Sequence, residues 1–264
     1  MKPFFFKNAD KQLFGVYHPS KFSQTQLEGV LLCYPFGLEY MRTHWAFRQL
    51  AQKLTQIGYA TLRFDYYGTG DSMGEDGTIE QWTTDVHAAI HQLVNNSHSN
   101  TISMIGCRLG AALAVQALIE GTRVKKLVLW DPIINGKRYI NELSNMHQKK
   151  LKEISSRYPY TREEITSAET QELLGYPFPT QLRHSIEKID LCNASFHGSE
   201  QTLLIVSEQR EEYLMLQNHI SKTAQNATLI HLSDPSSSWK NLRHSDNQLL
   251  SNKTLTTIVE ALKQ

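Results

Sequence analysis

Short apolar runs alternate with amphipathic segments along most of the chain. Continuous apolar runs of four to eight residues are typical of strands buried on both faces. They occur at residues 29–34, 59–64, 101–105, 126–130, 203–206 and 227–232. Apolar residues at steps of three and four predict helices around residues 47–57, 79–93, 111–120 and 255–262, the second with Thr78 as its N-cap.

The first two segments have a different pattern. Residues 3–7 and 12–18 are rich in Phe, Val and Tyr, and Asn8-Ala9-Asp10 separates them, so we expect a β-hairpin. Beyond it, strands that alternate with helices imply a mostly parallel, doubly wound sheet covered by helices on both faces. In such sheets the ligand crevice lies at the carboxyl ends of the strands.

Residues 133–200 contain no strand-like apolar run, but they show helical periodicity interrupted near Tyr158 and Tyr176. We therefore predict an α/β core formed by residues 1–132 and 201–264, with a helical lid inserted at 133–200.

Charge and cysteine content narrow the class of protein. The 264 residues include 27 Lys and Arg against 26 Asp and Glu, a net charge of +1, which gives no reason to expect nucleic acid or an anionic membrane surface. No apolar run approaches the ~18–20 residues of a membrane span. Three widely spaced cysteines, Cys33, Cys107 and Cys192, fit a reducing compartment, so we expect a cytoplasmic protein without disulfides.

One motif carries the chemistry. Gly106-Cys107-Arg108-Leu109-Gly110 follows a predicted buried strand and precedes an Ala-rich helix. Two glycines at this spacing permit the sharp turn of a nucleophile elbow, which presents its central residue above the sheet. In this order of elements the motif predicts the α/β-hydrolase fold.

Several further motifs carry a resemblance across nearly the whole chain. They are Tyr34-Pro35-Phe36-Gly37-Leu38-Glu39, Asp65-Tyr66-Tyr67-Gly68-Thr69-Gly70-Asp71-Ser72, Gly106–Ala111, Leu129-Trp130-Asp131-Pro132, Gly136-Lys137 and Gly175-Tyr176-Pro177. With them the chain resembles the serine-aminopeptidase-like branch of the α/β-hydrolases, most closely the hydrolases associated with exosortase systems. The resemblance implies an acyl ligand from secondary metabolism or the cell envelope, and substrate contacts at Glu39 and Trp239.

The central residue of the elbow departs from hydrolase chemistry. A nucleophile must present a deprotonated oxygen or sulfur, whereas the guanidinium of Arg108 is a cation that only donates hydrogen bonds. Cys107 stands one residue earlier, where the side chain of a strand points to the opposite face. We therefore interpret Cys107 as structural.

The remaining triad positions are also unusual. The acid would be Glu208 or Glu211 after the strand at 203–206, or Asp131 after the preceding strand, and the base would be His244. His87 and His91 are spaced for zinc on one helix face, but no third ligand accompanies them, so we expect no metal and no cofactor.

Backbone donors of an oxyanion hole would survive at Phe36 and Leu109, because they do not depend on side-chain identity. Arg108 beside them would form an anion pocket for a ligand carboxylate or phosphate. Alternatively, Asp131, Asp65 or Glu39 neutralises Arg108 internally, since a buried unpaired arginine is costly.

Three functions follow from these alternatives. The first is a non-hydrolytic member of the fold that binds or rearranges an acyl or carboxylated small molecule. The second is an ester or thioester hydrolase that uses Cys107, or a water activated by His244 with Glu211 or Asp131. The third is an interaction module for another protein, with an acyl-carrier protein as a candidate partner.

Overall fold

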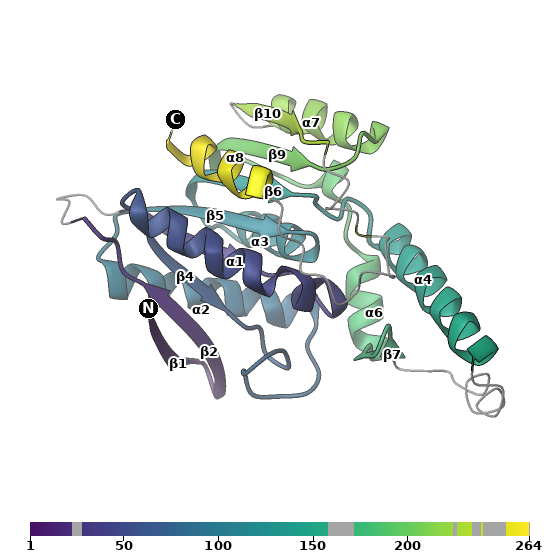
Figure 1. Cartoon of the computed structure of the whole chain (residues 1–264). Helices are drawn as coiled ribbons and strands as arrows, with labels where there is room; N and C mark the ends of the chain where they lie inside the picture. Colours follow the sequence, from purple (N-terminus) through teal and green to yellow (C-terminus); the bar gives the residue numbers. More distant parts are fainter. Residues whose placement is uncertain (23–27, 158–171, 224–225, 234–238, 240–251, 264) are drawn as a thin grey trace.

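A computed structural model of the chain describes residues 1–22, 28–157, 172–223, 226–233, 239 and 252–263. Its main feature is an eight-stranded sheet in the order β1-β2-β4-β3-β5-β6-β9-β10 (Figure 1). The strands are β1 Lys2–Asn8, β2 Lys11–His18, β3 Glu28–Cys33, β4 Ala60–Phe64, β5 Thr101–Cys107, β6 Val124–Trp130, β9 Ser199–Val206 and β10 Ala227–His231.

The sheet is mostly parallel, as the alternation of strands and helices predicts. From β4 to β10 every neighbouring pair of strands is parallel. Strands β1 and β2 form the predicted antiparallel hairpin, in which Asn8 pairs with Lys11, and β2 continues antiparallel to β4.

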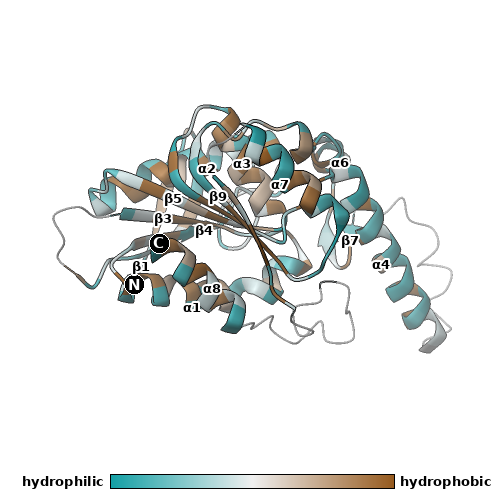
Figure 2. Cartoon of the chain, turned by 90° about the horizontal axis from the view of Figure 1, so that it is seen from above, coloured by the Kyte–Doolittle hydropathy of each residue, from teal (hydrophilic) through white to brown (hydrophobic). Residues whose placement is uncertain are grey.

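Helices cover both faces of this sheet. Helices α1 (Leu38–Gln56) and α8 (Asn252–Lys263) pack together on one face, while α2 (Ile79–Ser97), α3 (Leu109–Ile119) and α7 (Glu211–Thr223) lie on the other (Figure 2). Thr78 is the N-cap of α2, as predicted, because its hydroxyl accepts a hydrogen bond from Gln81 N at 3.2 Å.

The segment between β6 and β9 is predicted from the sequence to be a helical lid, but it also contains strands. It contains α4 (Gly136–Arg157), α6 (Thr180–Glu187) and the 3-10 turn η2 (Leu191–Asn193), but also a two-stranded ladder of β7 (Glu172–Leu173) and β8 (Tyr176–Pro177). Leu174 and Gly175 close this ladder with φ values of 56° and 90°, a turn that helical periodicity does not reveal. Strand β9 begins at Ser199, inside the expected lid; the division into core and lid stays a prediction.

The end of β5 also needs a correction. The apolar run predicts a strand that stops at residue 105 and a turn over 106–110, but β5 continues to Cys107. Gly106 and Cys107 pair with Leu129 and Trp130 of the parallel strand β6, so the ladder extends the strand beyond its apolar run. The turn therefore contains only Arg108, and α3 starts at Leu109.

Candidate functional site

The turn between β5 and α3 is strained. Arg108 has φ 52° and ψ −118°, a conformation that costs a non-glycine residue of order 1–3 kcal/mol. Its backbone is held from both sides, because Arg108 N donates to Trp130 O at 2.9 Å and Arg108 O accepts from Ala111 N at 3.1 Å and Ile133 N at 3.3 Å. The sheet and the following helix thus fix this sharp strand-to-helix turn, which is the backbone form of an elbow.

The side chain of Arg108 is neutralised inside the protein. Its Nε donates to Glu39 Oε1 at 2.9 Å, its Nη1 donates to the backbone oxygen of Asp131 at 3.3 Å, and the side chain is 5% exposed. The guanidinium carbon also lies 5.6 Å and 5.1 Å from the ring centres of Tyr139 and Trp239. Of the three acids considered as partners from the sequence, Glu39 is therefore the one whose carboxylate meets Arg108.

Tyr139 completes this ion pair. Its hydroxyl donates to Glu39 Oε2 at 2.9 Å, so each oxygen of the carboxylate accepts a hydrogen bond. Burial, the largest single effect, lowers the pKa of Arg108, but the Glu39 carboxylate together with Tyr213, Tyr139 and Asp131 outweighs it, so the pKa of Arg108 is raised. Burial, with the same carboxylate, raises the pKa of Tyr139 well above its ordinary value. The group is thus a buried, charge-balanced cluster.

Asp131 lies beside this cluster but uses its carboxylate elsewhere. Oδ1 accepts from Ser207 N at 2.7 Å, and Oδ2 accepts from the Trp239 indole N–H at 2.8 Å. Burial raises the pKa of Asp131, although both hydrogen bonds favour its ionised form. Its carboxylate therefore joins the start of the β9–α7 connection to Trp239.

Asp65 is committed to its own loop after β4. Oδ1 accepts from the Tyr40 hydroxyl at 2.9 Å, and Oδ2 accepts from Asp71 N at 3.0 Å. A Cβ at Gly70, which has φ 53°, would lie 2.2 Å from Asp65 Oδ2. The glycine-rich sequence from Asp65 to Ser72 therefore encodes a loop wrapped around one carboxylate.

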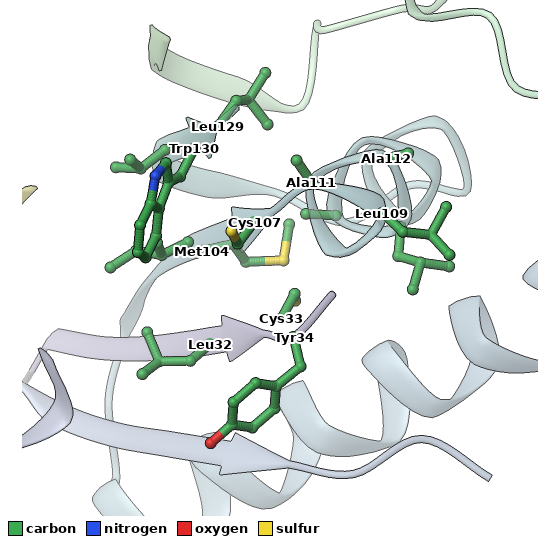
Figure 3. Packing of buried hydrophobic residues seen from close by; sticks show 14 of the residues in the cluster. Leu32, Cys33, Tyr34, Met104, Cys107, Leu109, Ala111, Ala112, Leu129 and Trp130 are labelled. Carbon is green, nitrogen blue, oxygen red and sulfur yellow. The ribbon is translucent and has the colours of Figure 1, made fainter. Parts of the chain in front are cut away.

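The thiol of Cys107 lies in the core, with Met104 and Trp130 nearby (Figure 3). Its side chain is fully buried, and burial raises its pKa well above the ordinary value. A buried thiol held in its protonated form is a poor nucleophile.

The two other acid candidates, Glu208 and Glu211, are not in the Arg108 cluster. Glu211 is exposed at the first turn of α7, and Glu208 pairs with Arg210 at 2.8 Å. His244 lies outside the described residues. The pair His87 and His91 forms other contacts, with Glu120 and Asn95, each at 3.1 Å. Within the ranges given above, no cluster of His, Cys, Asp and Glu could hold a metal ion.

A small cavity opens beside the ion pair. It has a volume of about 20 Å³, enough for about one water. Phe36 lines it, and Leu109 is the first residue of α3, where backbone N–H groups have no partner within the helix. We call it the site cavity; its lining includes Phe36, Glu39, Arg42, Tyr139, Leu143, Leu174 and Trp239.

Tyr139 is the residue of this cluster that the sequence did not single out. It lies in the first turn of α4, three residues after Gly136, and its ring is 2% exposed. From the sequence pattern, a tyrosine on the apolar face of an amphipathic helix is predicted to be an ordinary core residue. Its hydrogen bond to Glu39 joins positions 100 residues apart and is not visible in local sequence.

The sheet order, the covering helices and the elbow define an α/β-hydrolase fold. Solved structures of that fold superpose over nearly the whole chain. An esterase of Pyrococcus furiosus covers 99% of this chain and 89% of its own at 19% identity, with a TM-score of 0.68. Est1E of Butyrivibrio proteoclasticus with bound ferulic acid covers 98% and 96% at 16% identity, with a TM-score of 0.64.

Sequence comparison assigns the chain to one family within this class of fold. The family described as serine aminopeptidase, S33, matches residues 40–176, more than half of the chain, and the chain belongs to that family. A curated relative, the uncharacterized protein YcjY of Escherichia coli, is 31% identical over 118 residues, 42% of this chain. The matched region spans 38% of the length of that relative. No helix in the described ranges is long and apolar enough to cross a membrane.

Proposed function

We propose that this protein binds an acyl or carboxylated small molecule beside the elbow and does not hydrolyse it through a serine nucleophile. One observation carries the proposal: Arg108 occupies the strained tip of the β5–α3 turn and is held there by Glu39. In α/β-hydrolases this tip presents the nucleophile. A guanidinium has no lone pair to attack an acyl carbon, so an acyl-enzyme does not form on it.

The alternative of a displaced thiol nucleophile has less support. Cys107 is the last residue of β5, and its side chain points into the core instead of the site cavity. An acyl group would need to enter a region that is fully packed, and the thiol would need to ionise against its raised pKa.

The ligand class follows from the cavity. Two of the five N–H donors of Arg108 are engaged in the hydrogen bonds to Glu39 and Asp131 O, which leaves donors for a ligand carboxylate or ester carbonyl. Leu143, Met146 and Leu174 supply apolar surface to the site cavity, which Glu39, the ion-pair partner of Arg108, also lines. A molecule with an anionic or carbonyl head and an apolar body would satisfy both parts.

Because the site cavity holds about one water, a ligand must displace side chains to enter. Leu143 and Met146 lie on α4, and Leu174 lies in the β7–β8 turn, so the segment between β6 and β9 would move as the lid. The proposal takes its wider ligand class, a secondary-metabolic or cell-envelope intermediate, from the resemblance to exosortase-associated hydrolases. Ferulic acid, the aromatic carboxylate bound to Est1E, supports benzoate as a probe.

The test combines turnover and binding. We expect neither wild type nor Cys107→Ala to hydrolyse p-nitrophenyl esters or acyl thioesters above background. We expect titration calorimetry to show hexanoate or benzoate binding to wild type, and binding at least tenfold weaker to the double variant Glu39→Gln/Arg108→Met, which removes the Arg108 cation without leaving the Glu39 carboxylate buried and unpaired. Arg123→Met, which removes an exposed arginine, is the matched control.

Two results would contradict the proposal. Turnover by wild type that Cys107→Ala abolishes would identify a thiol hydrolase. Full carboxylate affinity in the double variant, with its fold confirmed by circular dichroism, would show that Arg108 does not hold the ligand.

A further inference from the structure

Phe36 and Gly37 border a second, larger cavity besides the site cavity. It has a volume of about 140 Å³ and lies between the β3–α1 loop, the β4–α2 loop and the segment from β8 to α6. We call it the ring cavity and define it by Phe36, Tyr40, Trp82, Tyr176, Pro179 and Leu182. Neither the ion pair of Arg108 nor the proposed function uses it.

The walls of the ring cavity offer mainly carbon. The polar atoms on two of its rings are already engaged, since the Tyr40 hydroxyl donates to Asp65 at 2.9 Å and the Trp82 indole N–H donates to Tyr67 O at 2.8 Å. The Thr69 hydroxyl donates to Tyr66 O at 2.9 Å. A ligand therefore meets ring faces, proline and leucine, with the exposed Glu75 carboxylate as the charged group of the lining.

The rings are arranged as aromatic clusters prefer. Phe36 and Trp82 have ring centres 5.4 Å apart at an angle of 36°, and Phe36 lies 6.1 Å from Phe178 at 42°. Tilted and offset pairs of this kind gain stability beyond the area they bury. A further aromatic ring in the cavity would extend the cluster.

The loop that forms one side of the cavity is fixed before any ligand arrives. Gly68 and Gly70 have φ values of 73° and 53°, and the loop from Asp65 to Ser72 that contains them closes on the Asp65 carboxylate, which accepts from Asp71 N. A pocket whose shape is already formed loses little conformational entropy when a ligand binds.

From these contacts we propose that the ring cavity is a binding site for one neutral, six-membered aromatic ring of a small molecule. The volume supports the size, because an engineered apolar cavity of about 150 Å³ stays dry and binds benzene. Because the polar groups of Tyr40, Trp82 and Thr69 already have hydrogen-bond partners, they favour an uncharged ligand. The cluster of rings favours an aromatic ligand over an aliphatic one. This inference goes beyond the proposed function and does not depend on Arg108.

Fluorine NMR of 4-fluorophenol with the full-length protein tests the site. We expect binding with a dissociation constant on the order of 1 mM, displaced by phenol and at least tenfold less well by cyclohexanol. Tyr176→Ala, which removes a half-buried wall, and Leu182→Trp, which fills the cavity, should each weaken binding at least tenfold. Phe5→Ala removes a ring that is 54% exposed in β1 and serves as the matched control.

The double variant Glu39→Gln/Arg108→Met separates this site from the carboxylate site, and it should bind 4-fluorophenol as wild type does. Unchanged binding in folded Tyr176→Ala and Leu182→Trp would overturn the proposal. So would tetramethylammonium binding in place of 4-fluorophenol, because the rings and Glu75 would then form a cage for a cation. Loss of binding in the double variant alone would place the ring in the site cavity and would equally overturn it.

Discussion

His18, at the end of β2, shows how one buried residue couples charge to stability. Its ring is 4% exposed, and its Nε2 accepts a hydrogen bond from Arg63 Nε at 3.1 Å. Arg63 also donates to the Tyr34 hydroxyl at 2.9 Å. Burial first, and then the charge of Arg63, lowers the pKa of His18 to about 4. The folded protein therefore keeps this histidine neutral.

We expect His18 to make the protein less stable in acid. Between about pH 6.5 and about pH 4 the unfolded chain binds a proton at His18 and the folded chain does not. The stability present above pH 6.5 is thus lost as the pH falls, by on the order of 3 kcal/mol at pH 4. Urea unfolding at several pH values measures this loss, and His18→Gln, which keeps a hydrogen-bond acceptor but does not titrate, should remove most of it. The same loss in wild type and His18→Gln would show that other groups cause it.

Among the elements, helix α3 lies very close to the end of strand β3, next to the site. A Cβ placed on Gly110 would lie 2.2 Å from Cys33 O and 2.3 Å from Tyr34 O, both backbone atoms. Because neither atom can rotate away, a side chain at Gly110 would push the helix off the sheet. This contact fixes the elbow relative to the β3–α1 loop that carries Phe36 and Glu39.

We expect Gly110→Ala to cost about 3 kcal/mol or more in the free energy of unfolding, because it forces backbone apart in a close-packed core. Gly121→Ala is the control: Gly121 has φ 106° with nothing within 4 Å of its Cβ, so only backbone strain of about 1–2 kcal/mol applies. Thermal and urea unfolding of both variants measure the difference. Equal costs would mean that α3 moves away from β3 without difficulty.

At the scale of the whole molecule, one buried apolar cluster joins the sheet to the segment between β6 and β9. It includes Leu31 and Val128 from the strands together with Tyr139, Phe178 and Ile186 from that segment. Residues that share one core lose their packing together.

We therefore expect the chain to unfold in one cooperative transition, with no earlier step for residues 133–200. Far-ultraviolet and near-ultraviolet circular dichroism recorded against urea should give coincident curves. An early near-ultraviolet transition that leaves the secondary structure intact would instead show a lid that opens independently.

The local sequence predicts most elements well because periodicity and capping are local properties. Thr78 caps α2 as expected, and the apolar runs mark the parallel strands. Errors occur where partners distant in sequence decide the structure. Strand β5 extends to Cys107 because β6 pairs with it, and β7 and β8 form on a turn at Leu174 and Gly175.

The sequence by itself determined the α/β-hydrolase fold, because the periods of strands and helices are local properties of the chain. It also placed Arg108 in the elbow motif, and a guanidinium is a cation without nucleophilic character wherever it lies. Only the tertiary structure decided which acid neutralises that cation. Glu39, Asp65 and Asp131 all follow strands that end at the same edge of the sheet, so the sequence leaves the three equivalent. In the folded protein Tyr40 and Asp71 occupy the carboxylate of Asp65, and Ser207 and Trp239 occupy that of Asp131. Glu39 then pairs with Arg108, because a buried charge needs a partner and only the packed structure fixes which acid is left to provide one.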